Sequence, residues 1–347
     1  MKSSRLRRLF LALAALTIAL PVAAQDNSLL TSKAADRSTK LLAAATAEKE
    51  VNLYTAFRPQ DLQTVVAPFE KKYGIKVKVW RSGSDNVMRR VITEATAKRN
   101  EVDVVMITSP ELEAVNREKL LQPIESPYFA DLLPGSVPAH KLWATVLMNV
   151  WVQAYNTNAV KKEDLPKTYQ DLADPKWKGK LGVENKVFEW YASIVRDMGE
   201  EKGIKMFNEI IGTNGVSTRQ GMSLLNNMVV AGEVPLALTM YVDIPEKGKR
   251  AGQPIDWIAL EPTFAMGFNV AVARNAPRPN AAALFADYML SPDTQKLLAS
   301  LYFYPTSTKA PSNYSKMKVR LIDPVFSVDT YDKWTKSYED VVTKRPK

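Results

Sequence analysis

Residues 51–84, VNLYTAFRPQDLQTVVAPFEKKYGIKVKVWRSGS, contain the strand–helix–strand pattern on which our prediction of the fold rests. Residues 51–56 are typical of a strand, and apolar side chains at nearly helical spacing predict a helix over residues 61–73. Gly74 ends this helix, and residues 75–80 alternate with period two, which predicts a strand with one solvated face. The pattern continues with a helix over 86–97, a strand over 102–107 and a helix over 111–118. We therefore predict an α/β protein with a mostly parallel sheet flanked by helices.

The middle of the chain repeats this alternation between two long strand-like runs, residues 144–154 and 263–273. Between the two runs we predict strands at 180–183, 233–241 and 255–260 and helices at 190–196, 202–211 and 222–231. The simplest architecture is two lobes, each a mostly parallel sheet flanked by helices, joined by two crossing strands that act as a hinge. The predicted lobe one comprises residues 49–153 plus 264–347, and lobe two residues 154–263.

The first 24 residues have the charge, length and cleavage chemistry of a secretory signal peptide. Four basic residues precede an uncharged apolar run at 9–20, which is shorter than the roughly 20 residues that span a bilayer. Small side chains at 21–24 then suit cleavage before Gln25. We expect export to a bacterial periplasm, with residues 25–48 forming a loose leader or a short amphipathic helix. The chain contains no cysteine, so disulfides, cysteine-based zinc sites and iron–sulfur centres are excluded.

The sequence offers little support for catalysis or nucleic-acid binding. The formal net charge is +10, but the basic residues are scattered among 37 acidic ones and form no stripe with interleaved aromatics. There is one histidine, His140, and there is no Gly-x-Ser-x-Gly elbow, P-loop or dinucleotide fingerprint. We expect carboxylate pairs such as Glu111 and Glu113 to lie on solvated helix faces. We therefore predict no catalytic residues, no metal ligands and no cofactor.

Anion-binding chemistry recurs where the predicted strands end. Backbone N–H groups at helix starts, hydroxyl side chains and arginines can hold an anion, and ligands bind beyond the carboxyl ends of parallel strands. Two aromatic side chains supply an apolar part. The candidate ligand-binding residues are Arg58, Arg81, Ser82, Ser84, Thr108, Ser109, Trp190, Thr218, Arg219 and Tyr241.

Five segments taken together resemble the periplasmic solute-binding proteins of bacterial ABC importers, of the type II fold, in the branch of ferric-ion-binding proteins and their organic-anion-binding relatives. They are residues 51–84, EVDVVMITSPELEAV with LLQPIESP, YNTNAV with TYQDLADPKWKGKLGVEN, MVVAGEVPLALTMY, and FNVAVARNAPRPNAAALFADYMLSPDTQKLLA. The resemblance runs in order over residues 51–299. It implies a two-lobe protein that closes on a solute and delivers it to a permease in the inner membrane.

The resemblance also implies where a ferric site would lie, and the chain departs from the family pattern there. The family's site uses two adjacent tyrosines, whereas Tyr241 is followed by Val242. Phe57 and Arg58 occupy the histidine segment, and positive charge opposes cation binding. We therefore expect a small anionic organic solute carrying phosphate, phosphonate or carboxylate. The alternatives are ferric ion and, from another class, a secreted carboxylate-dependent hydrolase. We expect a monomer.

Overall fold

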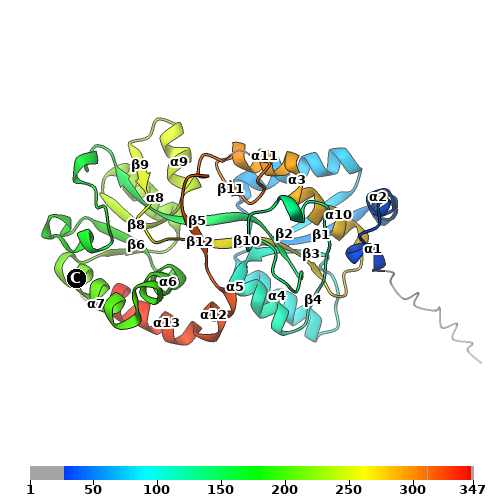
Figure 1. Ribbon diagram of the computed structural model, residues 1–347, viewed down its shortest axis with the longest axis horizontal. Helices are drawn as coiled ribbons and strands as arrows, with labels where there is room; N and C mark the ends of the chain where they lie inside the picture. The colour runs from blue at the N-terminus through cyan, green and yellow to red at the C-terminus, as the bar shows by residue number, and fades with distance from the viewer. Residues whose placement is uncertain (1–26, 311, 345–347) are drawn as a thin grey trace, which may run out of the picture.

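Two α/β lobes are joined by the long strands β5 (Ala144–Asn156) and β10 (Thr263–Ala273), which run antiparallel beside each other through the middle of the molecule (Figure 1). The computed structural model describes residues 27–310 and 312–344. The strands follow the order β2-β1-β3-β10-β5-β8-β6-β7, so that one continuous path of hydrogen bonds passes from lobe to lobe. The two strands correspond to the two long runs seen in the sequence.

Lobe one is built on parallel pairing of β1 (Glu50–Thr55) with β2 (Lys76–Arg81) and with β3 (Val104–Thr108). Pro59 at the first helical position and Gly74 in the left-handed conformation begin and end the helix predicted here. The helices of this lobe are α3 (Pro59–Tyr73), α4 (Ser84–Thr96), α5 (Ser109–Arg117), α10 (Pro279–Leu290) and α11 (Pro292–Ser300). The short strands β4 (Leu121–Gln122) and β11 (Tyr304–Pro305) pair with β10 and β5.

Lobe two repeats the arrangement with parallel pairing of β6 (Leu181–Glu184) to β7 (Ser217–Arg219) and β8 (Leu236–Tyr241). Its helices are α6 (Phe188–Met198), α7 (Glu200–Asn214), α8 (Met222–Ala231) and α9 (Asp243–Arg250), and β9 (Ile255–Ile258) pairs with β5. The residues directly after β8 begin α9, whose buried side carries Asp243, Pro245, Glu246 and Gly248. Short 3-10 turns lie at Phe129–Asp131, Lys162–Asp164, Gln170–Ala173 and Pro175–Trp177.

The hinge strands are held to lobe one by a buried polar network. Thr145 Oγ1 donates to Asn269 Oδ1 at 2.8 Å, and Asn269 Nδ2 donates to Ser109 Oγ at 3.1 Å. Ser109 Oγ in turn donates to the carbonyl of Gly267 at 3.1 Å. Every residue of β10 is buried. The start of α5 therefore follows any movement of the hinge strand.

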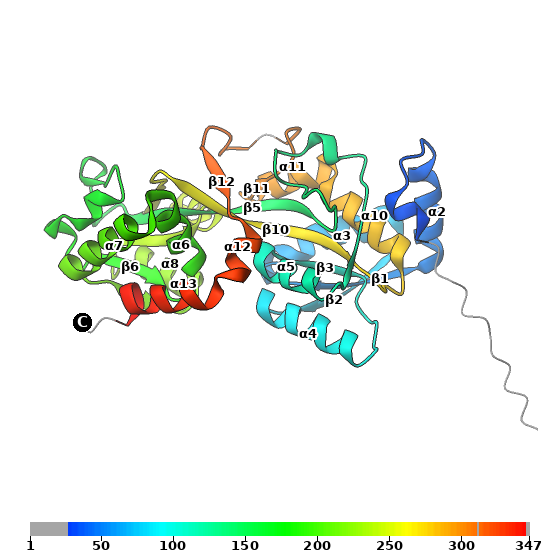
Figure 2. The ribbon, with the colours of Figure 1, turned by 60° about the horizontal axis from the view of Figure 1, so that its bottom comes forward.

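The segment at 25–48 contains two helices where the structure describes it, which agrees with the expected short amphipathic helix better than with a loose leader. The helices α1 (Ser28–Thr31) and α2 (Arg37–Glu48) pack on α10, with Leu30 and Leu41 fully buried (Figure 2). Arg37 pairs with Asp287 at 2.6 Å and donates to two backbone carbonyls. The predicted signal peptide and Gln25 lie outside the described residues. Among the described helices, none is long and apolar enough to cross a bilayer.

The C-terminal segment crosses from one lobe to the other (Figure 2). β12 (Val319–Leu321) pairs with β10, α12 (Pro324–Asp329) contacts α5, and α13 (Tyr331–Tyr338) lies against α6. Trp334 and Tyr338, followed by the π-helical turn Glu339–Thr343, pack into the core of lobe two. These contacts place residues 331–344 with lobe two, in contrast to our grouping of 264–347 with lobe one. The burial of apolar side chains of α13 in the core of lobe two explains this position.

Candidate ligand cleft

A cavity of about 360 Å³ opens between the two lobes. It lies where the carboxyl end of β1 faces the first turns of α8 and α9. Lobe one contributes Arg58 and Gln60, and lobe two contributes Ser223, Asn226, Asn227, Ile244, Lys247, Gly248, Ala251 and Gln253. Of the ten ligand-binding residues predicted from the sequence, Arg58 alone lines this cavity.

Four acidic side chains from both lobes converge near the phenol of Tyr241, at the end of β8. Burial raises the pKa of Tyr241, and the charges of Glu189, Glu111, Glu184 and Asp243 raise it further. Tyr241 is half-buried and lies beside Trp151, with 6.0 Å between the ring centroids. Because Glu111 belongs to lobe one and the other groups to lobe two, this phenol stands where the lobes meet.

Glu189 occupies the first turn of α6 and is 9% exposed. Burial raises its pKa to about 8, with further contributions from the charges of Glu111 and Glu184. Burial also raises the pKa of Glu111, whose carboxylate accepts a hydrogen bond from Thr108 Oγ1. Among the described residues, no cation is near enough to lower the pKa of Glu111 or Glu189. The charge of Glu111 on lobe one thus acts on Glu189 on lobe two, and neither side chain is among those that line the interlobe cavity.

Glu184 differs from these two because its carboxylate is already satisfied. Its oxygens accept from the backbone N–H groups of Gly221 at 3.1 Å and Lys186 at 2.7 Å. It therefore adds negative charge to the cleft while fixing the loops that follow β6 and β7.

The arginines predicted to hold an anion already have partners in the protein. Arg58 forms an ion pair with Asp243 and lies 3.5 Å from Asp61. Arg81 is exposed and donates from Nε to the carbonyl of Phe57 at 3.2 Å. Arg219 donates from Nη1 to the carbonyl of Thr218 at 2.7 Å, and its Nε lies 2.8 Å from the sulfur of Met228.

The predicted hydroxyl donors mainly serve the protein's own loops. Ser82 Oγ accepts from Asn86 Nδ2 at 3.1 Å, and Ser84 Oγ accepts from the N–H of Thr108 at 3.3 Å. Thr108 faces Glu111, and Ser109 belongs to the buried hinge network. Thr218 lies half-buried in β7.

Trp190 is placed in the core of lobe two. It is 1% exposed and packs between Tyr169 and Phe207, at centroid distances of 6.1 and 5.4 Å. The neighbouring Glu189, which we did not single out, is also buried, and the charges of Glu111 and Glu184 act on it. The same strand-end argument that drew attention to Trp190 would have found Glu189, since it lies in the helical turn after β6.

The expectation that Glu111 and Glu113 lie on solvated faces is wrong. Glu111 is half-buried, and Glu113 is 6% exposed, accepting from Arg117 Nε at 3.0 Å. The start of α5 packs toward the hinge, which removes both carboxylates from full solvation. Within residues 27–310 and 312–344, no group of three or more histidine, cysteine, aspartate or glutamate side chains is arranged to hold a metal ion. Any metal set in the cleft would thus need the phenol of Tyr241.

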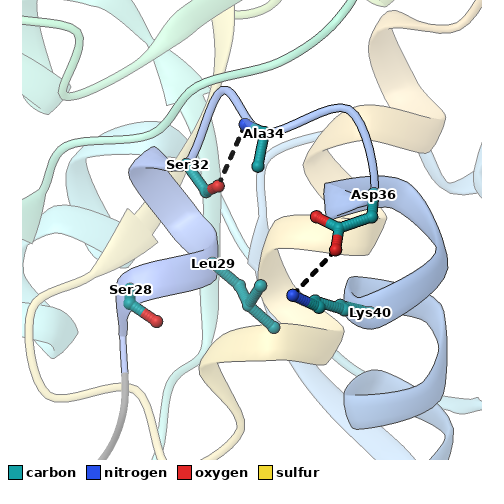
Figure 3. A pocket seen from close by; sticks show the side chains of 6 residues that line it. All are labelled: Ser28, Leu29, Ser32, Ala34, Asp36 and Lys40. Carbon is teal, nitrogen blue, oxygen red and sulfur yellow. Dashed lines mark hydrogen bonds and ion pairs between the residues drawn. The ribbon is translucent and has the colours of Figure 1, made fainter.

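A second cavity, of about 430 Å³, lies on the N-terminal helices far from the hinge (Figure 3). Its two charged side chains pair with each other, Lys40 Nζ with Asp36 Oδ2 at 2.8 Å. It offers a ligand no free charge, so the interlobe cavity remains the candidate site.

The family model of the bacterial extracellular solute-binding proteins matches residues 64–318. The chain belongs to this family. Its members lie outside the cytoplasm, bind small ligands and work with ABC permeases, as the sequence resemblance implied.

Two relatives carry names that refer to iron. "Iron uptake protein A1" of a Synechocystis strain is 25% identical over 289 residues, which are 77% of this chain and 79% of the relative. "Major ferric iron-binding protein" of Neisseria gonorrhoeae is 23% identical over 294 residues, covering 79% of this chain and 86% of the relative.

Among solved structures, the periplasmic binding protein AfuA from Actinobacillus pleuropneumoniae, with fructose-6-phosphate bound, superposes with a TM-score of 0.72. The match covers 85% of this chain and 99% of AfuA at 22% identity. This likeness confirms the two-lobe periplasmic-binding-protein fold and leaves the ligand open.

Proposed function

We propose that this protein is the ferric-ion-binding component of an ABC importer, which captures Fe³⁺ between its lobes and delivers it to an inner-membrane permease. The proposal is supported by the effect that the charges of Glu189 and Glu111, one from each lobe, have in raising the pKa of the Tyr241 phenol. Like charges brought together in a partly buried cleft oppose one another, and a bound cation relieves that repulsion. The iron-related names of the relatives support the same conclusion.

The donor types also suit Fe³⁺, which is a hard cation that prefers anionic oxygen ligands. The phenolate of Tyr241 and the carboxylates of Glu189 and Glu111 would supply three such oxygens from both lobes. Because Glu184 is held by two backbone N–H groups, we assign it an electrostatic role. The remaining positions around the metal would be filled by water or by oxygens of a chelator that arrives with it.

The partners of the arginines weaken the hypothesis that the ligand is an anionic organic solute. Arg58 is paired with Asp243, and Arg81 is exposed and bound to a backbone carbonyl. The negative charge of Glu184, which acts on Tyr241, would oppose a phosphate or carboxylate binding beside this phenol. Arg219 is the remaining candidate for anion binding, and it is tested separately below.

Titration with ferric citrate tests the proposal, because ferric–phenolate coordination produces a visible charge-transfer band. We expect the wild-type protein to develop this band and Tyr241→Phe to lose it. Glu189→Gln should keep a weaker band with at least tenfold lower affinity, since it loses one charged ligand. Tyr331→Phe is the matched control, because Tyr331 is 54% exposed on α13 and should leave the band unchanged. A colourless wild-type protein that binds a phosphorylated solute would overturn the proposal.

We further propose that the protein is not an enzyme, in keeping with the binding role of its family. A carboxylate-dependent hydrolase would release product from an ester or glycoside, whereas a binding protein returns its ligand unchanged. Mass spectrometry of ligand recovered from the protein distinguishes the two.

A further inference from the structure

Two ion pairs connect the lobes at α3 and α9, away from the hinge strands. Arg58 and Asp61 stand at the start of α3 in lobe one, and Asp243 and Lys247 stand on α9 in lobe two. The Arg58 guanidinium donates to Asp243, and Lys247 Nζ donates to the two carboxylate oxygens of Asp61 at 3.0 and 2.9 Å. Each lobe thus contributes one cation and one anion.

Both cations also lie over one aromatic ring of lobe one. Arg58 Cζ is 4.6 Å and Lys247 Nζ 5.0 Å from the ring centroid of Phe303, which is 5% exposed. Asp61 and Asp243 are 6% and 3% exposed, so both pairs are shielded from solvent. Shielded pairs are screened less by salt than surface pairs and interact more strongly.

We propose that Arg58, Asp61, Asp243 and Lys247 form an interlobe clasp that stabilises the closed arrangement of the ligand-free protein. If the lobes separate, both pairs break, and α3 and α9 each carry one cation and one anion into solvent. The clasp is neutral overall, so it favours closure without attracting a ligand of either sign. It therefore sets how much of the empty protein is closed, whatever the ligand is.

The clasp also affects ligand binding in a predictable direction. A ligand that binds only the closed form is weakened in proportion to the fraction of empty protein that is open. Because Arg58 and Lys247 also line the interlobe cavity, the closed fraction of the ligand-free protein, and not ligand affinity, is the measurement that isolates the clasp.

The absence of cysteine allows a direct measurement of lobe separation. Lys71→Cys on α3 and Lys205→Cys on α7 place two labels at exposed positions, one on each lobe. Single-molecule energy transfer between dyes at these sites then reports the closed and open populations of the ligand-free protein.

In the protein that carries Lys71→Cys and Lys205→Cys, the further substitution Lys247→Met keeps the apolar stem of the side chain and removes one charge of the clasp. We expect the closed-to-open ratio to fall on the order of tenfold, because the shielded pair of Lys247 with Asp61 is lost. Asp61→Asn should have a similar effect, and the double variant should add little to either, because both remove the same pair. Salt at 1 M, where the screening length is about 3 Å, should open the wild type more than the variants.

Lys249→Met is the matched control. Lys249 lies on the same helix and pairs with Asp256 at 2.8 Å, but that pair is contained within lobe two. It should leave the distance distribution unchanged. A Lys247→Met distribution that matches the wild type, or a Lys249→Met shift as large as that of Lys247→Met, would overturn the clasp. Because no ligand is added, this failure is distinguishable from failure of the ferric proposal.

Discussion

Glu111 on lobe one raises the pKa of Glu189 on lobe two through its charge, so the two carboxyl groups influence each other across the boundary between the lobes. Burial, with the charge of Glu111, raises the pKa of Glu189 to about 8. Such a pair is unfavourable in the empty protein and is relieved by a cation or by a proton. The first prediction concerns Glu189, and the others concern Arg219, Trp190 and Gly267 of the hinge strand.

Glu189→Gln should make the stability of the ligand-free protein less dependent on pH. The pKa of Glu189 rises from an ordinary 4.5 to about 8 on folding. Between these values the folded protein keeps a proton that the unfolded chain releases, so the free energy of unfolding falls as pH rises. The variant should gain on the order of 1–3 kcal/mol over wild type at pH 8.5 and nearly nothing at pH 4.

Scanning calorimetry at both pH values measures this difference. Glu201→Gln, at an exposed position on α7, is the control and should follow the wild type. Equal gains at both pH values would show that Glu189 is not protonated in the folded protein.

Arg219→Ala tests the anion hypothesis at its strongest remaining point. Within the described residues, the Arg219 side chain donates to two neutral groups, the sulfur of Met228 and the carbonyl of Thr218, so no carboxylate neutralises its charge. If Fe³⁺ is the ligand, the variant should bind ferric citrate within about threefold of wild type. If the arginine holds an anion, the loss of one charged hydrogen bond should weaken binding tenfold to a hundredfold, or roughly 1.5–3 kcal/mol.

Isothermal calorimetry with ferric citrate and with a sugar phosphate separates these outcomes. Sugar-phosphate binding by the wild type that Arg219→Ala abolishes would restore the anion hypothesis.

Trp190→Ala should reduce stability and leave ligand affinity intact. Trp190 is 1% exposed and lies between Tyr169 and Phe207, so truncation leaves a cavity in the core of lobe two. The expected loss is about 3–5 kcal/mol of unfolding free energy. Urea unfolding and binding at a temperature where the variant is folded measure the two effects. Trp190→Phe should lose less stability, and a variant that folds well and fails to bind would return Trp190 to the site.

Gly267→Ala should disturb the hinge. A Cβ atom at this position would lie 2.6 Å from Ser109 Oγ and 3.2 Å from both Asn269 Oδ1 and Thr145 Cγ2. We expect a loss of about 1–3 kcal/mol, because the buried network around β10 must shift. Adding Ser109→Ala removes the closest atom and should recover part of the loss.

Gly83→Ala is the control for this substitution. Its added Cβ would meet only the flexible, exposed side chain of Asp85, at 3.1 Å, and should cost little. Thermal unfolding of the single and double variants measures the difference, and an unperturbed Gly267→Ala would show that the network tolerates expansion.

The sequence by itself determined the lobes and the strands that join them. Residues 51–84 alternate between periods of two and about 3.6, and the long runs at 144–154 and 263–273 are mostly apolar, so local pattern was enough to place β1, α3, β2, β5 and β10. The position of the cleft followed from the rule that parallel strands present their carboxyl ends together.

Only the tertiary structure decided which side chains face that cleft and with what charge. The sequence alone gives no partner for the charge of Arg58. In the folded protein, Asp243 on α9 of the other lobe neutralises it. Glu189 and Trp190 are neighbours on α6 and both are buried, but Trp190 packs among aromatic rings of the core whereas Glu189 lies where the charges of Glu111 and Glu184 act on it. Charge pairing and side-chain direction depend on residues that are distant along the chain, so they cannot be predicted from a local stretch of sequence.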